Sequence, residues 1–120
     1  MDGDMTTWTG AAAQDLAEDL MRSPQTDYVR VAADWMTRAG DVSAAADLTG
    51  DRLIDALVAA AAAYVALRRG GPEPSWCVGR SLDTFWHPGP AAFLAWSFAH
   101  APGAFKCRGL LVEEESLMSV

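Results

Sequence analysis

An all-α fold, arranged as one compact domain of four to five helices, is what this sequence predicts, and three observations lead to it. Apolar residues recur every three or four positions in several segments. Prolines and glycines stand where such segments would begin and end. No stretch alternates apolar and polar residues for long enough to build a sheet. We therefore expect helices at about residues 10–22, 24–38, 51–69, 90–100 and 102–107.

The first two expected helices have clear start signals. Thr9 can act as the N-cap of TGAAAQDLAEDLMRS, in which apolar residues share one side and acids the other. In SPQTDYVRVAADWMTRAG, Ser23 can cap the helix and Pro24 fits the first helical position, where a missing N–H costs nothing. Gly40 can end this second helix.

The longest expected helix lies in DRLIDALVAAAAAYVALRRGG, after a connector, DVSAAADLTG, that we expect to carry one short helical turn. Gly70-Gly71-Pro72 should end it. Its apolar run, residues 56–67, is too short to cross a bilayer, which takes about 20 helical residues. The segment therefore predicts a core helix, and we expect no membrane partner.

The C-terminal part follows a stiff link, PEPSWC. We expect a short helix in SLDTFW capped by Ser81, then helices that start at Pro90 and Pro102. The ending GLLVEEESLMSV predicts a short extended piece, a polar turn and a frayed tail. A single domain over residues 1–120 would thus join acidic helices at about 10–70 to an aromatic-rich region at about 74–112.

Aromatic residues gather in that second region, where seven of the chain's eleven lie within thirty residues. On the helix from Pro90, one face carries Phe93, Trp96 and His100. A different face carries Leu94 and Phe98. A helix that is apolar nearly all round is either enclosed by its own domain or partly covered by a partner, and we favour enclosure. The residues that we expect in the core are Trp35, Leu57, Val58, Val65, Phe93 and Phe105.

The net charge of −7 is unevenly spread along the chain. Residues 1–60 hold eleven acids against four arginines, whereas residues 61–120 hold five acids and five bases. Phosphate groups repel such a protein, so we expect no direct nucleic-acid binding. The acidic half would attract a basic protein partner, although a face that simply keeps the protein in solution is the plainer interpretation.

No catalytic or phosphate-binding motif occurs, so we predict a protein that is not an enzyme and needs no cofactor. Cys77, His87, His100 and Cys107 lack the local pair spacing of zinc sites, so we also predict no metal. A dyad of Cys107 and His100 has no orienting Asp or Asn close by. The acidic start and the two distant cysteines indicate a cytoplasmic protein with reduced thiols.

Arg108 stands beside apolar residues in FKCRGLL. Burial of an unpaired charge is costly, so its guanidinium should bond to a carboxylate or to helix-end carbonyls. Gly109 suits a tight reversal with positive φ. We favour a structural role for Arg108, and a recognition contact is the alternative.

Three short motifs follow one another in the C-terminal half: Pro74-Ser75-Trp76, then Trp86-His87-Pro88, then PGAFKCRGLL from Pro102. In this order they resemble the helical C-terminal region of small bacterial, often actinobacterial, proteins that are antitoxin-like or accompany regulators. The resemblance covers residues 66–120. It implies an antitoxin-like role with no catalytic residue. The acidic first half shows no helix-turn-helix pattern of a DNA-binding regulator.

Together these observations predict a non-enzymatic protein-binding protein, an antitoxin-like inhibitor or regulator of a protein partner such as a basic toxin. A self-associating scaffold domain, active as a homo-oligomer, is one alternative. A small helical ligand-binding protein or enzyme, with a pocket lined by Trp76, Trp86, Trp96 and His100, is the other. The candidate partner- or ligand-binding residues are Trp76, Trp86, His87, Trp96, His100, Lys106 and Arg108.

Overall fold

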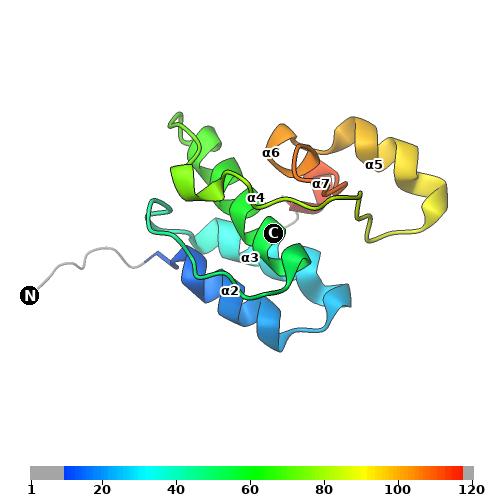
Figure 1. Cartoon of the computed structure of the whole chain (residues 1–120). Coiled ribbons are helices and arrows are strands. Elements are labelled where there is room, and N and C mark those ends of the chain that lie inside the picture. The colour runs from blue at the N-terminus through cyan, green and yellow to red at the C-terminus, as the bar shows by residue number, and fades with distance from the viewer. Residues whose placement is uncertain (1–9, 118–120) are drawn as a thin grey trace, which may run out of the picture.

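Helix α4 (Arg52–Arg68) is the centre of the computed structural model, which describes residues 10–117 (Figure 1). From Ile54 to Ala66 every residue of α4 except Tyr64 is buried. Helices α2 (Ala13–Arg22) and α3 (Tyr28–Arg38) pack against it, as do α6 (Gly103–Lys106) and the 3₁₀ turn η2 (Ser75–Cys77). The run of alanines allows this close approach on every side. No strand occurs within residues 10–117, so the predicted all-α fold is confirmed.

The start signals of the first two helices differ from the prediction. Thr9 lies outside the described residues, and Ala12 occupies the N-cap position of α2. Ser23 does not cap the following helix, because its hydroxyl donates to the backbone oxygen of Asp19 at 2.7 Å. It therefore satisfies a carbonyl at the end of α2 instead. A 3₁₀ turn, η1 (Gln25–Asp27), then leads into α3.

Two glycines hold the ends of α2 and α3 together. A Cβ atom on Gly10 would lie 2.1 Å from the Cα of Gly40, closer than any side chain can come. This contact lets the Ala11 N–H donate to the Arg38 oxygen at 2.8 Å, while the Gly40 N–H donates to the Ala11 oxygen at 2.9 Å. Arg69, the residue after α4, joins α4 to this contact by donating to the Gly40 oxygen at 2.6 Å.

The connector before α4 has no helical turn, contrary to the prediction. Its backbone is held by polar contacts to α4: buried Asp55 accepts hydrogen bonds from the Thr49 N–H at 2.9 Å and from the Thr49 hydroxyl at 2.8 Å. Asp51 is the N-cap of α4 and accepts from the N–H of Leu53 at 2.9 Å. Gly70, with φ of 82°, follows the end of α4 as predicted.

The predicted helix in SLDTFW is wrong. This segment contains no helix: it bends at Asp83 and Thr84, and Trp86 forms an isolated parallel bridge with Leu110. The Trp86 N–H donates to the Gly109 oxygen at 2.7 Å, and the Trp86 oxygen accepts from the Leu111 N–H at 2.9 Å. Pairing with a distant segment therefore replaces the local helical hydrogen bonds that a cap at Ser81 would have started.

The last segments agree with the prediction in part. Leu110 forms the bridge to Trp86, residues 111–113 lie in no helix or strand, and a helical turn, α7 (Glu114–Leu117), replaces the predicted polar turn. The 3₁₀ turn η3 (Ala91–Phe93) runs into α5 (Leu94–His100), which stands apart from α2, α3 and α4 in Figure 1. No helix within residues 10–117 has the length and apolar character needed to cross a membrane.

The core prediction is confirmed for five of its six residues. Phe93 is the exception, because its side chain is 58% exposed. The reason is that α4 fills the centre of the domain and α5 lies outside it. The five residues that are buried as predicted are Trp35, Leu57, Val58, Val65 and Phe105.

Candidate protein-binding surface

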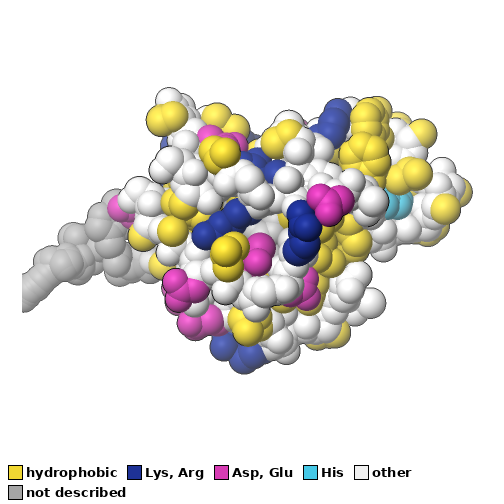
Figure 2. Space-filling view, in the orientation of Figure 1, with side chains coloured by type: hydrophobic (Ala, Val, Ile, Leu, Met, Phe, Trp, Pro, Cys, Tyr) yellow, Lys and Arg dark blue, Asp and Glu magenta, His cyan; other side chains and the backbone are white. Residues whose placement is uncertain are grey.

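Large apolar side chains are exposed along α5 and the segment before it. Figure 2 shows hydrophobic side chains gathered over this end of the molecule. A folded chain seldom leaves so many rings in water unless a ligand or partner covers them. We call these residues the aromatic surface: Phe85 (62% exposed), Phe93 (58%), Trp96 (52%), Leu94 (44%) and Phe98 (44%).

Three rings of the aromatic surface pack against another side chain: Phe85, Trp96 and Phe98. Phe85 and Phe98 pack edge to face, with ring centroids 5.7 Å apart. The Lys106 ammonium lies 5.0 Å from the centre of the Phe98 ring. On the other side of α5, the Trp96 and His100 rings stack at 3.8 Å. The surface is thus presented in a defined arrangement, which lowers the entropy cost of binding to it.

A chain of polar contacts fastens α5 to the rest of the domain through Ser97, the one buried residue of this helix. The Ser97 hydroxyl donates to Glu113 Oε2 at 2.6 Å and lies 2.8 Å from His87 Nε2. Glu113 Oε1 accepts from the Ser116 hydroxyl at 3.0 Å. The hydrogen bond from Ser97 is the main cause that lowers the pKa of Glu113, against an opposing effect of burial. The Glu113 carboxylate is therefore charged at neutral pH.

Serine, histidine and glutamate are also the residue types of a hydrolase triad, but their order here is different. In such a triad the histidine lies between the other two and takes the serine proton. Here the serine lies in the middle and donates its one hydrogen bond to Glu113, so its oxygen is left to accept from the Nε2–H tautomer of His87. Ser97 is also only 1% exposed. This geometry suits a structural tether for α5 rather than an attack on a substrate.

A groove runs beside α5, between the aromatic surface and the surface of α3 and α7. It consists of two adjoining hollows of about 440 Å³ and about 790 Å³, which share four lining residues: Thr26, Val29, Glu113 and Ser116. The first hollow is lined in addition by the 87–90 segment and by Phe93, Trp96 and Ser97. The second is lined in addition by Arg30, Ala33, Asp34 and Glu115. One wall of the groove is thus aromatic, and the other carries charged side chains.

Some of the predicted binding residues lie at the groove or the aromatic surface, and the others lie elsewhere in the domain. His87 and Trp96 line the groove, and His100 and Lys106 contact rings of the aromatic surface. Trp76 lies elsewhere, with its indole N–H donated to the Val42 oxygen at 2.9 Å and its ring beneath Arg80. Trp86 is half-buried in the bridge to Leu110. Of the four residues expected to share one pocket, only Trp96 lines the groove.

Arg108 is 4% exposed, and its guanidinium is bonded to groups within the domain. Its guanidinium pairs with Glu73 at 2.9 Å and donates to the backbone oxygens of Ala104 at 2.8 Å and Cys77 at 3.3 Å. The expected bonds to a carboxylate and to helix-end carbonyls are therefore confirmed. Gly109 has φ of 84°, also as predicted.

The two thiols lie in different surroundings. Burial raises the pKa of Cys77 to about 11, so this thiol stays protonated, whereas Cys107 is exposed. Across residues 10–117, no group of three or more His, Cys, Asp or Glu is placed to hold a metal ion.

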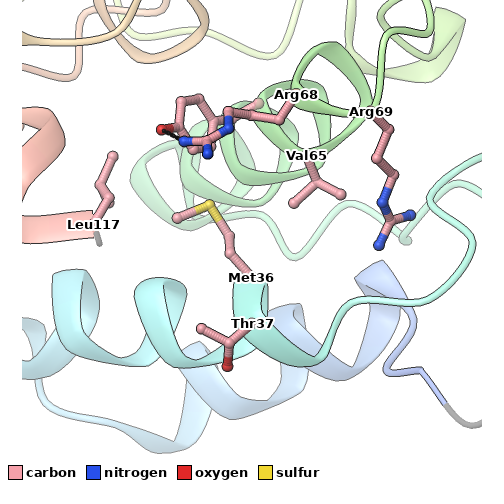
Figure 3. A pocket seen from close by; sticks show the side chains of 7 residues that line it. Met36, Thr37, Val65, Arg68, Arg69 and Leu117 are labelled. Carbon is pink, nitrogen blue, oxygen red and sulfur yellow. Dashed lines mark hydrogen bonds between the residues drawn. The ribbon is translucent and has the colours of Figure 1, made fainter. Parts of the chain in front are cut away.

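A smaller pocket of about 300 Å³ lies between α3, α4 and α7, and Figure 3 shows Met36, Val65 and Leu117 pointing into it. Polar side chains at the edge of this pocket already make hydrogen bonds within the domain. The Tyr64 hydroxyl donates to Glu114 at 2.7 Å and accepts from Arg68 at 2.9 Å. The groove beside α5, with its exposed rings, is the better candidate for a binding site.

Two residues of the site, Ser97 and Glu113, were missed from the sequence. Ser97 is the only hydroxyl residue in the apolar stretch AAFLAWSFAHA, and this isolation was an available signal. A lone polar residue on the buried side of a helix needs a partner, and that partner comes from a segment sixteen residues away. Glu113 is the first of three consecutive glutamates, so nothing local distinguishes it from Glu115.

Comparisons with protein-family models, with curated proteins and with solved structures each found no match for this chain. The resemblance of residues 66–120 to antitoxin-like proteins therefore stays a prediction.

Proposed function

We propose that this chain is a non-enzymatic, cytoplasmic protein-binding protein, an antitoxin-like inhibitor or regulator whose partner docks on the aromatic surface. One observation carries the proposal: α5 buries only Ser97 and leaves its aromatic rings in water. Aromatic residues are the commonest anchors at protein interfaces because each ring buries a large area with few rotatable bonds.

The polar tether adds a second argument. Ser97, Glu113 and His87 hold α5 against the domain through short hydrogen bonds, although the helix gains little from apolar burial. Such a fixed but exposed helix suits recognition, since its backbone need not become ordered when the partner binds. A helix that served only the stability of this domain would turn its rings inward.

A photo-crosslinking experiment tests the proposal. Benzoyl-phenylalanine is introduced in place of Phe93, and the protein is irradiated in living cells. The matched control carries the same group in place of Met21 on α2, because Met21 is 59% exposed and Phe93 is 58% exposed. We expect a discrete adduct with one other protein from position 93, lost when Trp96→Ser is added, and no such adduct from position 21.

Equal adducts from both positions, or none from position 93, would contradict the proposal. An adduct between two copies of this chain would instead support the scaffold alternative, in which the aromatic surface mediates self-association. Light scattering of the purified protein distinguishes that case, because a homo-oligomer has a multiple of the 12.8 kDa chain mass.

A further inference from the structure

We infer that the groove beside α5 binds a basic amphipathic segment of the partner, with its apolar side chains on the aromatic wall and its lysines or arginines on the opposite wall. This inference rests on the proposed function and adds the chemistry of the partner to it. Three features of the groove carry it: the charge of one wall, the rings of the other wall, and the charge of the chain as a whole.

The charged wall has acids that are not neutralised internally. Arg30 pairs with Asp27 at 3.3 Å and Asp34 pairs with Arg38 at 3.1 Å, so these four side chains balance one another. Glu113 and Glu115 take part in no ion pair within residues 10–117. The side chains that donate hydrogen bonds to Glu113 are the uncharged hydroxyl groups of Ser97 and Ser116. The wall therefore offers two carboxylates to an incoming cation.

The aromatic wall shares a hollow with Glu113, and Glu115 lines the adjoining hollow. Phe93 and Trp96 line the same hollow as Glu113 and are about half exposed. Aromatic faces bind both apolar side chains and cations, and arginine stacks on them especially well. Between Asp83 and Glu113 the sequence contains no acid, so this wall has no negative charge of its own. A segment with one apolar and one basic face would satisfy both walls together.

A second copy of the chain fits the groove less well. Each copy has a net charge of −7, so two copies repel each other, whereas a basic partner is attracted. The cation beside the aromatic surface, half-buried Lys106, already lies over the Phe98 ring. We therefore assign the groove to a partner segment and treat self-association as a result that would overturn this assignment.

The test uses a synthetic helix with leucine on one face and lysine on the other, and a second helix with glutamate in place of lysine. Each is titrated into the ¹⁵N-labelled full chain, and the indole N–H signals are followed by NMR. We expect the leucine–lysine helix to shift the signal of exposed Trp96 and to leave that of buried Trp35, which donates to the Ala12 oxygen, unchanged. The leucine–glutamate helix should shift neither signal.

Matched charge reversals separate the groove from general attraction to an acidic protein. Glu115→Lys alters the groove, while Glu18→Lys makes the same charge change at an exposed α2 position that lines neither hollow. We expect Glu115→Lys to weaken binding about tenfold or more, which corresponds to about 1.4 kcal/mol. Glu18→Lys should weaken it less than about threefold, because separated surface charges are screened by salt.

Equal weakening by both reversals, equal binding of both helices, or a dimer that involves the groove would each overturn the inference. These failures are distinguishable from a failure of the proposed function. If crosslinking from position 93 gives a partner adduct but the leucine–lysine helix does not bind at the groove, the aromatic surface binds a partner of different chemistry. If crosslinking also fails, the proposed function itself is wrong.

Discussion

Replacement of Arg108 by alanine should destabilise the domain strongly, and the structure allows the size of the effect to be worked out. The side chain is 4% exposed and makes an ion pair with Glu73 and hydrogen bonds to the oxygens of Ala104 and Cys77. Removal of one partner from a buried charged pair costs about 3–5 kcal/mol, because the other groups lose their bonds without regaining water.

Two features reduce this figure. The Glu73 side chain is 31% exposed, so water restores part of its solvation once Arg108 is gone. Arg108 Nε is buried without a hydrogen-bond partner, and its removal relieves a penalty of about 1 kcal/mol. We therefore expect a loss of about 2–3 kcal/mol in the free energy of unfolding. For a chain of this size, that lowers Tm by roughly 8–12 °C.

Thermal and urea denaturation of Arg108→Ala, followed by circular dichroism, measure this loss. Arg52→Ala is the matched control, since it removes an arginine–aspartate pair with Asp83 whose side chains are 64% and 81% exposed. The control should lose less than about 1 kcal/mol. If Arg108→Ala proved no less stable than Arg52→Ala, the argument that its buried bonds support the fold would be refuted.

Three further predictions concern packing, ionisation and the tether. Gly40→Ala should cost roughly 1–3 kcal/mol in urea denaturation, because the new Cβ would lie 2.9 Å from backbone atoms of Gly10. The free energy of unfolding should fall as pH rises from about 9 toward 11, because the pKa of Cys77 is raised in the folded protein and the thiol therefore loses its proton first in the unfolded chain. Over this range the urea midpoint of Cys77→Ala should fall less steeply than that of the unsubstituted protein. Ser97→Ala should remove about 1.5–3 kcal/mol of local stability at α5, measured as amide hydrogen exchange in this helix that is faster than in the unsubstituted protein.

Each of these predictions has a contrary result. Gly103→Ala is the control for glycine replacement, since no atom beyond its chain neighbours and its own helix backbone lies within 4 Å of its Cβ position. An equal loss there would refute the packing argument. An alkaline decline that is identical in Cys77→Ala would assign it to Tyr28 and Tyr64, whose pKa values burial also raises. Unchanged exchange in α5 after Ser97→Ala would show that the tether does not hold this helix.

Much of the helical layout was predictable because its signals are local. The α4 helix was expected at residues 51–69 and is found at Arg52–Arg68, between the acids before it and the glycines after it. The buried positions Leu57 and Val65 follow from spacing along the same helix. Positive φ at Gly109 and the need of Arg108 for buried acceptors likewise depend on the chemistry of single residues.

The candidate site was less predictable because its parts meet only in the folded chain. His87, Ser97 and Glu113 are separated by ten and sixteen residues, and no sequence rule pairs them. The helix predicted in the segment that ends at Trp86 was wrong for the same reason, since the hydrogen bonds of Trp86 go to Gly109 and Leu111.

Helices α4 and α5 show most clearly what the sequence by itself determined and what it did not. Both are apolar nearly all round, and the sequence established that for each of them. Only the tertiary structure decided that neighbours bury α4 from Ile54 to Ala66, apart from Tyr64. By contrast, α5 meets the domain through Ser97 and leaves Phe93 and Trp96 exposed. Periodicity specifies which face of a helix is apolar, but whether another element covers that face depends on contacts between residues far apart in the chain.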